Sequence, residues 1–309
     1  MSRIETACLF GLYGVVSVSM TLLNKALVDA FPLVLTTILV QNAGAILCSL
    51  LLTYLGLQQL KPIRASHFIP AFLNSIWLLA VIWSSMKALQ HVSVPLYVLA
   101  SNSRPLFTAA VELVWSGVRV PATRIFSIFL IVGGACLYAF HDASVSHEGL
   151  GYAVSYTLLV AGLSVYENKM MNAIKAEQTP LGVNLYRLVL STLLIFALLS
   201  HTEDVSMLIA IPTKTGIVLA ASSLLCLSIG VIMFYLQERA TATSIQVANV
   251  CFKLLATVCS LLFYPAHSAS VSFQGWLGYI ISTIGFVTYS FGNYKQHFED
   301  SGAEAKKGA

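Results

Sequence analysis

Five basic side chains lie inside long apolar stretches of this sequence: Lys25, Lys87, Arg104, Arg187 and Lys253. A cation at mid-membrane depth is costly, so such residues usually face a water-filled cavity or a partner of opposite charge. Arg104, Arg187 and Lys253 lie too far from the ends of their stretches to reach the membrane surface easily. A cavity lined by cations suits an anionic solute. The pattern therefore predicts a membrane transporter for a phosphorylated or otherwise acidic compound.

The composition places these cations in a polytopic membrane protein. Of the 309 residues, 57% are hydrophobic and 10% are charged, whereas soluble domains average about 25% charged residues. An apolar segment of about 20 residues is long enough to cross a membrane as a helix. We predict ten such helices, at residues 7–29, 33–57, 67–90, 93–116, 122–141, 149–172, 181–200, 215–236, 243–264 and 273–292.

The remaining basic residues set the orientation of these helices. Eleven Lys and Arg residues fall on the side that holds the N-terminus, and Lys214 alone falls on the other side. Basic residues accumulate on the cytosolic side of membrane proteins, so we expect both termini to be cytosolic. This topology accounts for the net charge of +4, and we expect membrane lipid rather than nucleic acid around the protein.

The two halves of the sequence resemble one another. The matching positions, in order, are Asn24-Lys25 with Asn168-Lys169, Pro32 with Pro180, Leu89-Gln90 with Leu236-Gln237, and Asn102 with Asn249. Each half then holds five helices, and because five is odd, the second half enters the membrane upside down. Inverted repeats of this kind place the substrate near the middle of the membrane and permit alternating access.

We therefore expect an all-α integral membrane fold with ten transmembrane helices in two inverted five-helix repeats. The chain is expected to form one transmembrane domain over residues 1–309. The first repeat covers about 7–141 and the second about 149–292. Residues 293–309 form a cytosolic tail.

Two stretches carry a family resemblance. The run Ser19–Lys25, S-M-T-L-L-N-K, resembles the first-helix signature of nucleotide-sugar transporters, and Ser84–Tyr97 resembles the junction of helices three and four in GDP-mannose transporters and their UDP-sugar relatives. The resemblance covers nearly the whole chain and is strongest over residues 15–142. It implies the drug/metabolite transporter fold. It also implies exchange of a cytosolic nucleotide sugar for a lumenal nucleoside monophosphate, with no catalytic residue, metal or cofactor.

Two motifs depart from the GDP-mannose transporters. Those proteins carry Phe-Tyr-Asn-Asn in helix seven, where this sequence has Leu185-Tyr-Arg-Leu188. They carry Gly-Ala-Leu-Asn-Lys in helix nine, where this sequence runs from Asn249 to Lys253. The paired asparagines, which that family associates with guanine recognition, are absent. A UDP-sugar such as UDP-N-acetylglucosamine is therefore at least as good a candidate as GDP-mannose.

The buried cations are the main candidates for phosphate binding. Lys253 matches the family lysine and is expected to bind the phosphates, with a structural ion pair to Glu112 or Glu167 as the alternative. The planar guanidinium of Arg187 is suited to grip a phosphate through two hydrogen bonds, or else it reaches the cytosolic interface. Arg104 either binds phosphate or pairs with Glu112, two helical turns away.

The uncharged candidates are expected to contact the base, the ribose or the sugar; they are Tyr97, Asn102, Tyr186 and Asn249. Packing and interhelical hydrogen bonding are the alternative roles for such residues. Glu112, Glu167 and Lys25 are expected to gate the cavity or to form ion pairs. For Lys25, extension to the membrane surface is the alternative.

The tail and the glycines indicate partners. Lys306-Lys307, followed by two residues, resembles the dilysine retrieval signal read by COPI coats, or is a chance basic ending. We therefore expect a Golgi membrane location with cycling through the endoplasmic reticulum. In the family, the last helix of each repeat packs between protomers. Gly133, Gly134, Gly278 and Gly285 would allow such close packing, which leaves a homodimer open.

Two other functions fit the same pattern less well. A sugar-phosphate/phosphate exchanger of the triose-phosphate translocator type would use the same cations, but no transit peptide precedes the first helix and the tail resembles a secretory address. A membrane scaffold without transport activity is the other alternative. It is disfavoured because buried cations only destabilise a protein that binds no anion.

Overall fold

The computed structural model describes most of the chain. The described residues are 3–31, 33–56, 61, 65–104, 107, 110, 122–141, 146–174, 177–203, 213–237, 245, 248–249, 252, 256–257, 259–260 and 272–289. Within them, every regular element is a helix. The labelled helices are α1 (Arg3–Ala30), α2 (Val34–Tyr54), α3 (Ala65–His91), α4 (Val94–Asn102), α6 (Ala122–Phe140), α7 (His147–Ile174), α8 (Pro180–Thr202) and α9 (Thr213–Gln237). A further helical segment covers residues 273–289.

Six of these helices, α1, α2, α3, α7, α8 and α9, are long and apolar enough to cross a membrane. They coincide with six of the predicted spans, and the all-helical integral membrane fold is confirmed at this level. Helix α4 covers the first part of the predicted span 93–116, and most of the predicted span 243–264 lies outside the described residues. The total of ten helices, the repeats and the domain boundaries stay predictions.

The surface and the interior differ as expected for a protein in lipid. Large apolar side chains point outward, including Tyr54 and Phe140, which are 88% and 85% exposed. Amides such as Asn74 and Asn102 are instead fully enclosed by the helices. Placing amides inside and hydrocarbon outside is favourable only where the surroundings are themselves apolar.

Local sequence signals set the start of two helices. Thr179 accepts a hydrogen bond from the Gly182 amide at 3.2 Å and caps α8, whose first residue is Pro180. A threonine cap satisfies a free amide of the first turn, and proline is well suited to the position after the cap. Helix α4 likewise begins next to a proline, Pro95, behind the extended residue Ser93.

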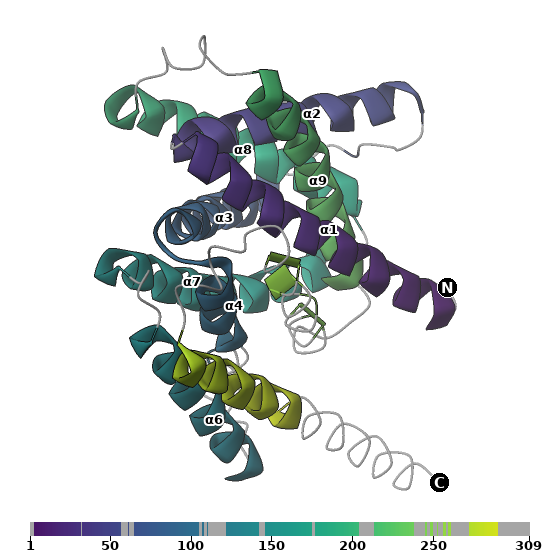
Figure 1. Cartoon of the computed structure of the whole chain (residues 1–309). Coiled ribbons are helices and arrows are strands. Elements are labelled where there is room, and N and C mark those ends of the chain that lie inside the picture. Colours follow the sequence, from purple (N-terminus) through teal and green to yellow (C-terminus); the bar gives the residue numbers. More distant parts are fainter. Residues whose placement is uncertain are drawn as a thin grey trace, which may run out of the picture.

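Helix α3 occupies a central position in the bundle. It packs against α7 on one side and α8 on another, while α9 packs against both α1 and α2 (Figure 1). The largest buried apolar cluster joins α2, α3, α4 and α7, and it includes Ile38, Met86, Leu99 and Ala153. This arrangement brings the interior faces of α3, α7, α8 and α9 together.

Amide side chains connect helices across the interior. Gln41 of α2 donates from Nε2 to Asn24 Oδ1 of α1 at 3.0 Å and to Ser222 Oγ of α9 at 3.1 Å. Asn42, the next residue, donates from Nδ2 to Ser191 Oγ of α8 at 3.0 Å. Hydrogen bonds of this kind stabilise helix association where the hydrophobic effect contributes little.

An acidic side chain joins the start of α2 to the end of α8. The Glu203 carboxylate accepts hydrogen bonds from the Leu35 amide (2.9 Å), the Thr36 amide (2.9 Å) and the Thr36 hydroxyl (2.8 Å). It thereby satisfies free amides in the first turn of α2, where a negative charge is also favoured by the helix dipole. The two helices are fixed to each other at this end of the bundle.

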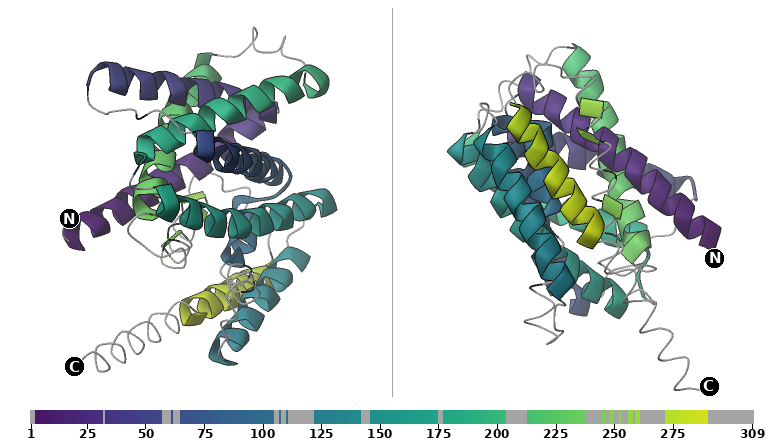
Figure 2. Two further views of the ribbon diagram at one scale, coloured as in Figure 1. Left: turned by 180° about the vertical axis from the view of Figure 1, so that it is seen from behind. Right: turned by 60° about the horizontal axis from the view of Figure 1, so that its bottom comes forward.

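Helix α6 and the helical segment 273–289 lie side by side, on the side of the molecule away from α2 (Figures 1 and 2). Their backbones approach closely at glycines. A Cβ atom on Gly134 would lie 2.5 Å from the Gly278 carbonyl oxygen and 2.5 Å from the Ser282 nitrogen, and one on Gly285 would lie 2.6 Å from Leu130 Cβ. A Cβ atom on Gly133, by contrast, would have no neighbour within 4 Å among the described residues. These helices pack within one chain.

Substitutions at the adjacent glycines test this contact. We expect Gly134→Val to lower stability by about 1–3 kcal/mol or more, because the new side chain meets backbone atoms that cannot move aside. Gly133→Val should leave stability nearly unchanged. Thermal unfolding of the two variants in detergent measures the difference. Equal melting temperatures for the two variants would contradict the packing described here.

Candidate functional site

The two buried arginines of the interior have different surroundings. Arg187 of α8 is 7% exposed and forms an ion pair with Glu167 of α7, with 2.8 Å between Nη1 and Oε1. Its Nη2 donates to Asn184 Oδ1 at 2.7 Å, and its guanidinium lies over the Phe234 ring, 4.5 Å from the centroid. The side chain therefore does not extend to the membrane surface. Its charge is neutralised within the protein.

Glu167 holds three helices together. Besides Arg187 of α8, it accepts a hydrogen bond at Oε2 from Gln237 Nε2 of α9 at 2.8 Å. Gly230 of α9 contributes by lacking a side chain, because a Cβ there would overlap the Asn184 amide. The predicted ion-pair role of Glu167 thus corresponds to a direct contact, and its partner is Arg187.

Arg104 is more deeply buried than Arg187, at 2% exposed, and its partners are uncharged. Its Nη2 donates to the Ser101 hydroxyl at 3.0 Å and to the Tyr156 hydroxyl of α7. The guanidinium also lies over the Tyr156 ring, 4.7 Å from the centroid. Its Nε has no hydrogen-bond partner, and no carboxylate pairs with it in the described part of the chain. Arg104 is a buried cation without a described counter-ion.

Two stacked tyrosines lie beside Arg104. The rings of Tyr97 and Tyr156 are 5.1 Å apart at an angle of 19°, and the Tyr97 and Ser85 hydroxyls are hydrogen bonded at 2.7 Å.

Buried amides extend this polar interior. Asn102, beside Arg104, is fully buried, and neither polar atom of its side chain has a hydrogen-bond partner in the described chain. Asn249 is 5% exposed, and its Oδ1 is also without a partner there. Buried polar atoms are normally paired, so both amides keep unused hydrogen-bonding capacity.

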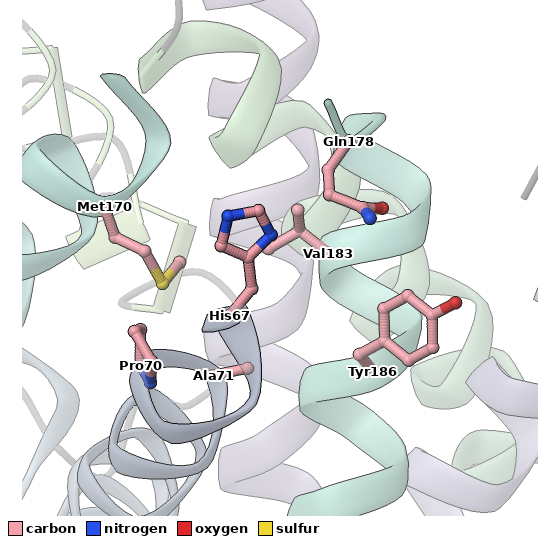
Figure 3. A pocket seen from close by; sticks show the side chains of 7 residues that line it. All are labelled: His67, Pro70, Ala71, Met170, Gln178, Val183 and Tyr186. Atoms are coloured by element: carbon pink, nitrogen blue, oxygen red, sulfur yellow. The ribbon is translucent and has the colours of Figure 1, made fainter. Parts of the chain in front are cut away.

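Tyr186 is separated from its neighbour Arg187. It lines a small pocket at the end of the bundle where α3 and α8 begin (Figure 3), and its hydroxyl donates to the Lys61 carbonyl at 2.9 Å. The side chains that line the pocket are His67, Pro70, Ala71, Met170, Gln178, Val183 and Tyr186. Tyr186 thus lies at the rim of the interior, although it is next to Arg187 in the sequence.

Lys25 is enclosed rather than extended to the membrane surface. It is 6% exposed, its Nζ donates to the Leu89 carbonyl of α3 at 2.9 Å, and it pairs with Asp29 at 2.9 Å. The surface-reaching alternative is therefore wrong for Lys25, because a carboxylate and a carbonyl within the protein satisfy its charge. Lys87 is half-buried and donates to Gln90 at 3.1 Å.

Four predicted residues lie outside the described residues: Lys253, Glu112, Lys306 and Lys307. Their predicted roles in phosphate binding, gating and retrieval stay predictions. Among the described residues, no three His, Cys, Asp or Glu side chains are grouped to hold a metal ion.

Sequence reasoning missed three residues that organise the arginines. The Tyr156 hydroxyl accepts a hydrogen bond from Arg104. Asn184 accepts one from Arg187, and Gln237 donates one to Glu167, the ion-pair partner of Arg187. Asn184 lies three residues before Arg187, so helical spacing alone would have placed the two side chains on one face. Tyr156 lies in α7 between small and apolar residues, and nothing local distinguishes it from a packing residue.

The sequence matches the model of the Triose-phosphate Transporter family over residues 4–290. The chain belongs to this family. The protein is therefore a transporter and not an enzyme. Its geometry agrees with that assignment, because an enclosed and cationic interior is suited to an anionic cargo.

Several similar proteins are named GDP-mannose transporters. A GDP-mannose transporter of Neurospora crassa is 28% identical over 158 residues, which are 49% of this chain and 40% of the relative. One from Arabidopsis thaliana is 25% identical over 301 residues, covering 90% of this chain and 76% of the relative. The match thus spans less than half the length of the Neurospora protein. A solved crystal structure shares the fold, with a TM-score of 0.61, 14% identity, and 93% and 96% of the two chains covered.

Removing the Glu167 charge tests the ion pair of the transporter. We expect Glu167→Gln to lower stability by about 3–5 kcal/mol, because Arg187 is left buried without a counter-charge. The double variant Glu167→Gln/Arg187→Met should recover much of this loss, since it removes both charges. Thermal unfolding of the single and double variants measures this coupling. A double variant no more stable than Glu167→Gln would contradict the pair.

Proposed function

We propose that this transporter is an antiporter, which imports a nucleotide sugar from the cytosol into the Golgi or endoplasmic reticulum lumen and returns a nucleoside monophosphate. The phosphate group common to both solutes is the feature that one cationic site recognises. Either solute favours closure of the site, whereas the empty site leaves its cations without counter-charges, so exchange is expected to be faster than one-way transport.

The observation that carries this proposal is the environment of Arg104. Its guanidinium is 2% exposed and hydrogen bonded only to hydroxyls, with no carboxylate partner in the described residues. Burying a charge is unfavourable unless an opposite charge accompanies it. A phosphate on the substrate supplies that charge, and the guanidinium offers it several donors in a fixed geometry.

Arg187 and Lys253 take part at different stages. Arg187 is already neutralised by Glu167 at 2.8 Å, so it can bind a phosphate only after exchanging this partner. Lys253, which matches the family lysine, is proposed as a further phosphate ligand. Glu167 and Lys25 act in gating, because each ties helices together near one end of the bundle.

The helix packing supports the proposed pair of inverted five-helix repeats. Under the predicted repeat, α1 corresponds to α7, α2 to α8 and α3 to α9. Packing of α1 on α9 then corresponds to packing of α7 on α3, and packing of α2 on α9 to packing of α8 on α3; all four contacts occur. Lys25 ties α1 to α3, and the equivalent helices α7 and α9 are tied by Glu167 and Gln237.

The sugar and the base of the substrate are indicated less directly than its phosphate. The relatives are named for GDP-mannose, yet residues 185–188 lack the paired asparagines that the resemblance associates with guanine. We therefore propose GDP-mannose or a UDP-sugar such as UDP-N-acetylglucosamine. The family description favours one other candidate, exchange of a sugar phosphate for phosphate.

The cellular setting of the proposal is a multi-pass protein of the Golgi membrane with both termini in the cytosol. Its dilysine tail would be read by COPI coats and return it to the endoplasmic reticulum. A homodimer stays a proposal, and its interface would not be the glycine faces of α6 and residues 273–289, because these faces pack on each other within one chain.

Ligand-dependent thermal stabilisation tests the proposed substrate class. A ligand at one hundred times its Kd stabilises the folded state by about 2.7 kcal/mol. We expect one of UMP, GMP, CMP and AMP, together with its sugar conjugates, to raise the melting temperature of the purified transporter. Stabilisation by phosphate or phosphorylated sugars alone would favour the sugar-phosphate exchanger.

Arg104→Gln tests the phosphate site itself. We expect affinity for the stabilising nucleotide to fall about 10- to 100-fold, since a hydrogen bond to a charged group contributes about 1.5–3 kcal/mol. Without ligand, the melting temperature should not fall, because the variant removes an uncompensated buried charge. An unchanged affinity would show that Arg104 does not bind the nucleotide.

Exchange itself is tested by uptake into vesicles. Uptake that is equally fast with and without internal monophosphate would contradict exchange.

A further inference from the structure

A small pocket lies between α3, α7 and α8. Its walls are His67, Pro70 and Ala71 of α3, Met170 of α7, and Val183 and Tyr186 of α8 (Figure 3). On a helix, residues three, four and seven positions apart share one face. The α3 residues that line the pocket follow this spacing, and the next position on their face is Asn74.

Asn74 lies at the depth of the Arg187 ion pair. The hydroxyl of Ser75, its neighbour, donates to the Arg187 carbonyl at 3.3 Å. On α7, the position one turn inward from Met170 is Glu167, which holds the Arg187 side chain. Asn74 and Glu167 thus each lie one helical turn further along the faces of α3 and α7 that line the pocket.

The Asn74 side chain is enclosed and unpaired. It is 1% exposed, and within the described chain neither its Oδ1 nor its Nδ2 has a hydrogen-bond partner. Asn42 is equally buried and its Oδ1 also has no partner within the described chain, but its Nδ2 donates to Ser191 at 3.0 Å. An enclosed amide without partners is unfavourable for the folded protein alone. Asn74 therefore differs from the amides that hold helices together.

We infer that Asn74 is a specificity-determining residue that hydrogen bonds the uncharged part of the substrate. This inference rests on the proposed function, because the ligand class is a nucleotide or its sugar conjugate. A primary amide presents one acceptor and two donors, which complement the adjacent carbonyl and N–H groups on the edge of a nucleobase. A site that pairs such groups rejects analogues that leave its amide unpaired. Arg104 supplies affinity for phosphate, and Asn74 distinguishes one base from another.

The test compares Asn74→Leu with Asn42→Leu, which have the same change of side chain at equal burial. The probes are UMP, GMP, CMP and AMP, with UDP-N-acetylglucosamine and GDP-mannose, and the readouts are melting temperature and nucleotide affinity. We expect Asn74→Leu to keep or raise the melting temperature without ligand. It should also lower the affinity for the preferred nucleotide at least 10-fold and reduce the preference for its base over the other bases. Asn42→Leu should lower the melting temperature and keep that preference within about twofold.

Asn74→Ala serves as a second variant, because the smaller side chain cannot clash with its neighbours, and it should lose the same base preference. A wild-type affinity and base preference in either Asn74 variant would overturn the inference while leaving the proposed function intact. A wild-type protein that no nucleotide stabilises would overturn both.

Discussion

Positive charge inside an apolar bundle is the constraint on which the rest of this structure depends. Each cation described in the interior is accommodated differently. Arg187 has the Glu167 carboxylate and Lys25 has Asp29 and a backbone carbonyl, whereas the partners of Arg104 among the described residues are hydroxyls and an aromatic ring. The first two charges are paired within the protein. In the proposed function, a substrate phosphate supplies the counter-charge for the third.

The same constraint limits how the helices can move. Glu167 binds Arg187 and Gln237 at once, so α7, α8 and α9 meet at one carboxylate. A motion that separates these helices must provide another partner for Arg187, since an isolated buried charge is strongly unfavourable. In the proposed function, a substrate phosphate is that partner, and its binding would couple substrate binding to helix rearrangement.

The sequence predicts the helices well and their contacts poorly. Long apolar runs identify α1, α2, α3, α7, α8 and α9, because a membrane span needs little more than length and hydrophobicity. The buried arginines are also evident, since charge is rare in such runs. Their partners are not: the sequence suggests Glu112 and Glu167 as partners of Lys253, and only the folded structure brings Glu167 to Arg187. Asn74 cannot be singled out from the sequence, because a polar residue in a membrane span usually forms hydrogen bonds between helices. Only the structure shows that its side chain has no partner among the described residues.

The Glu203 contact with α2 has a consequence for the making of the protein. The carboxylate and the amide that it caps are 168 residues apart in the chain. At a synthesis rate of about 5–20 residues per second, the start of α2 waits about 8–34 s for its capping residue. During that interval the first turn of α2 must obtain its hydrogen bonds from water or lipid headgroups. The start of α2 therefore reaches its final form only after α8 has been made.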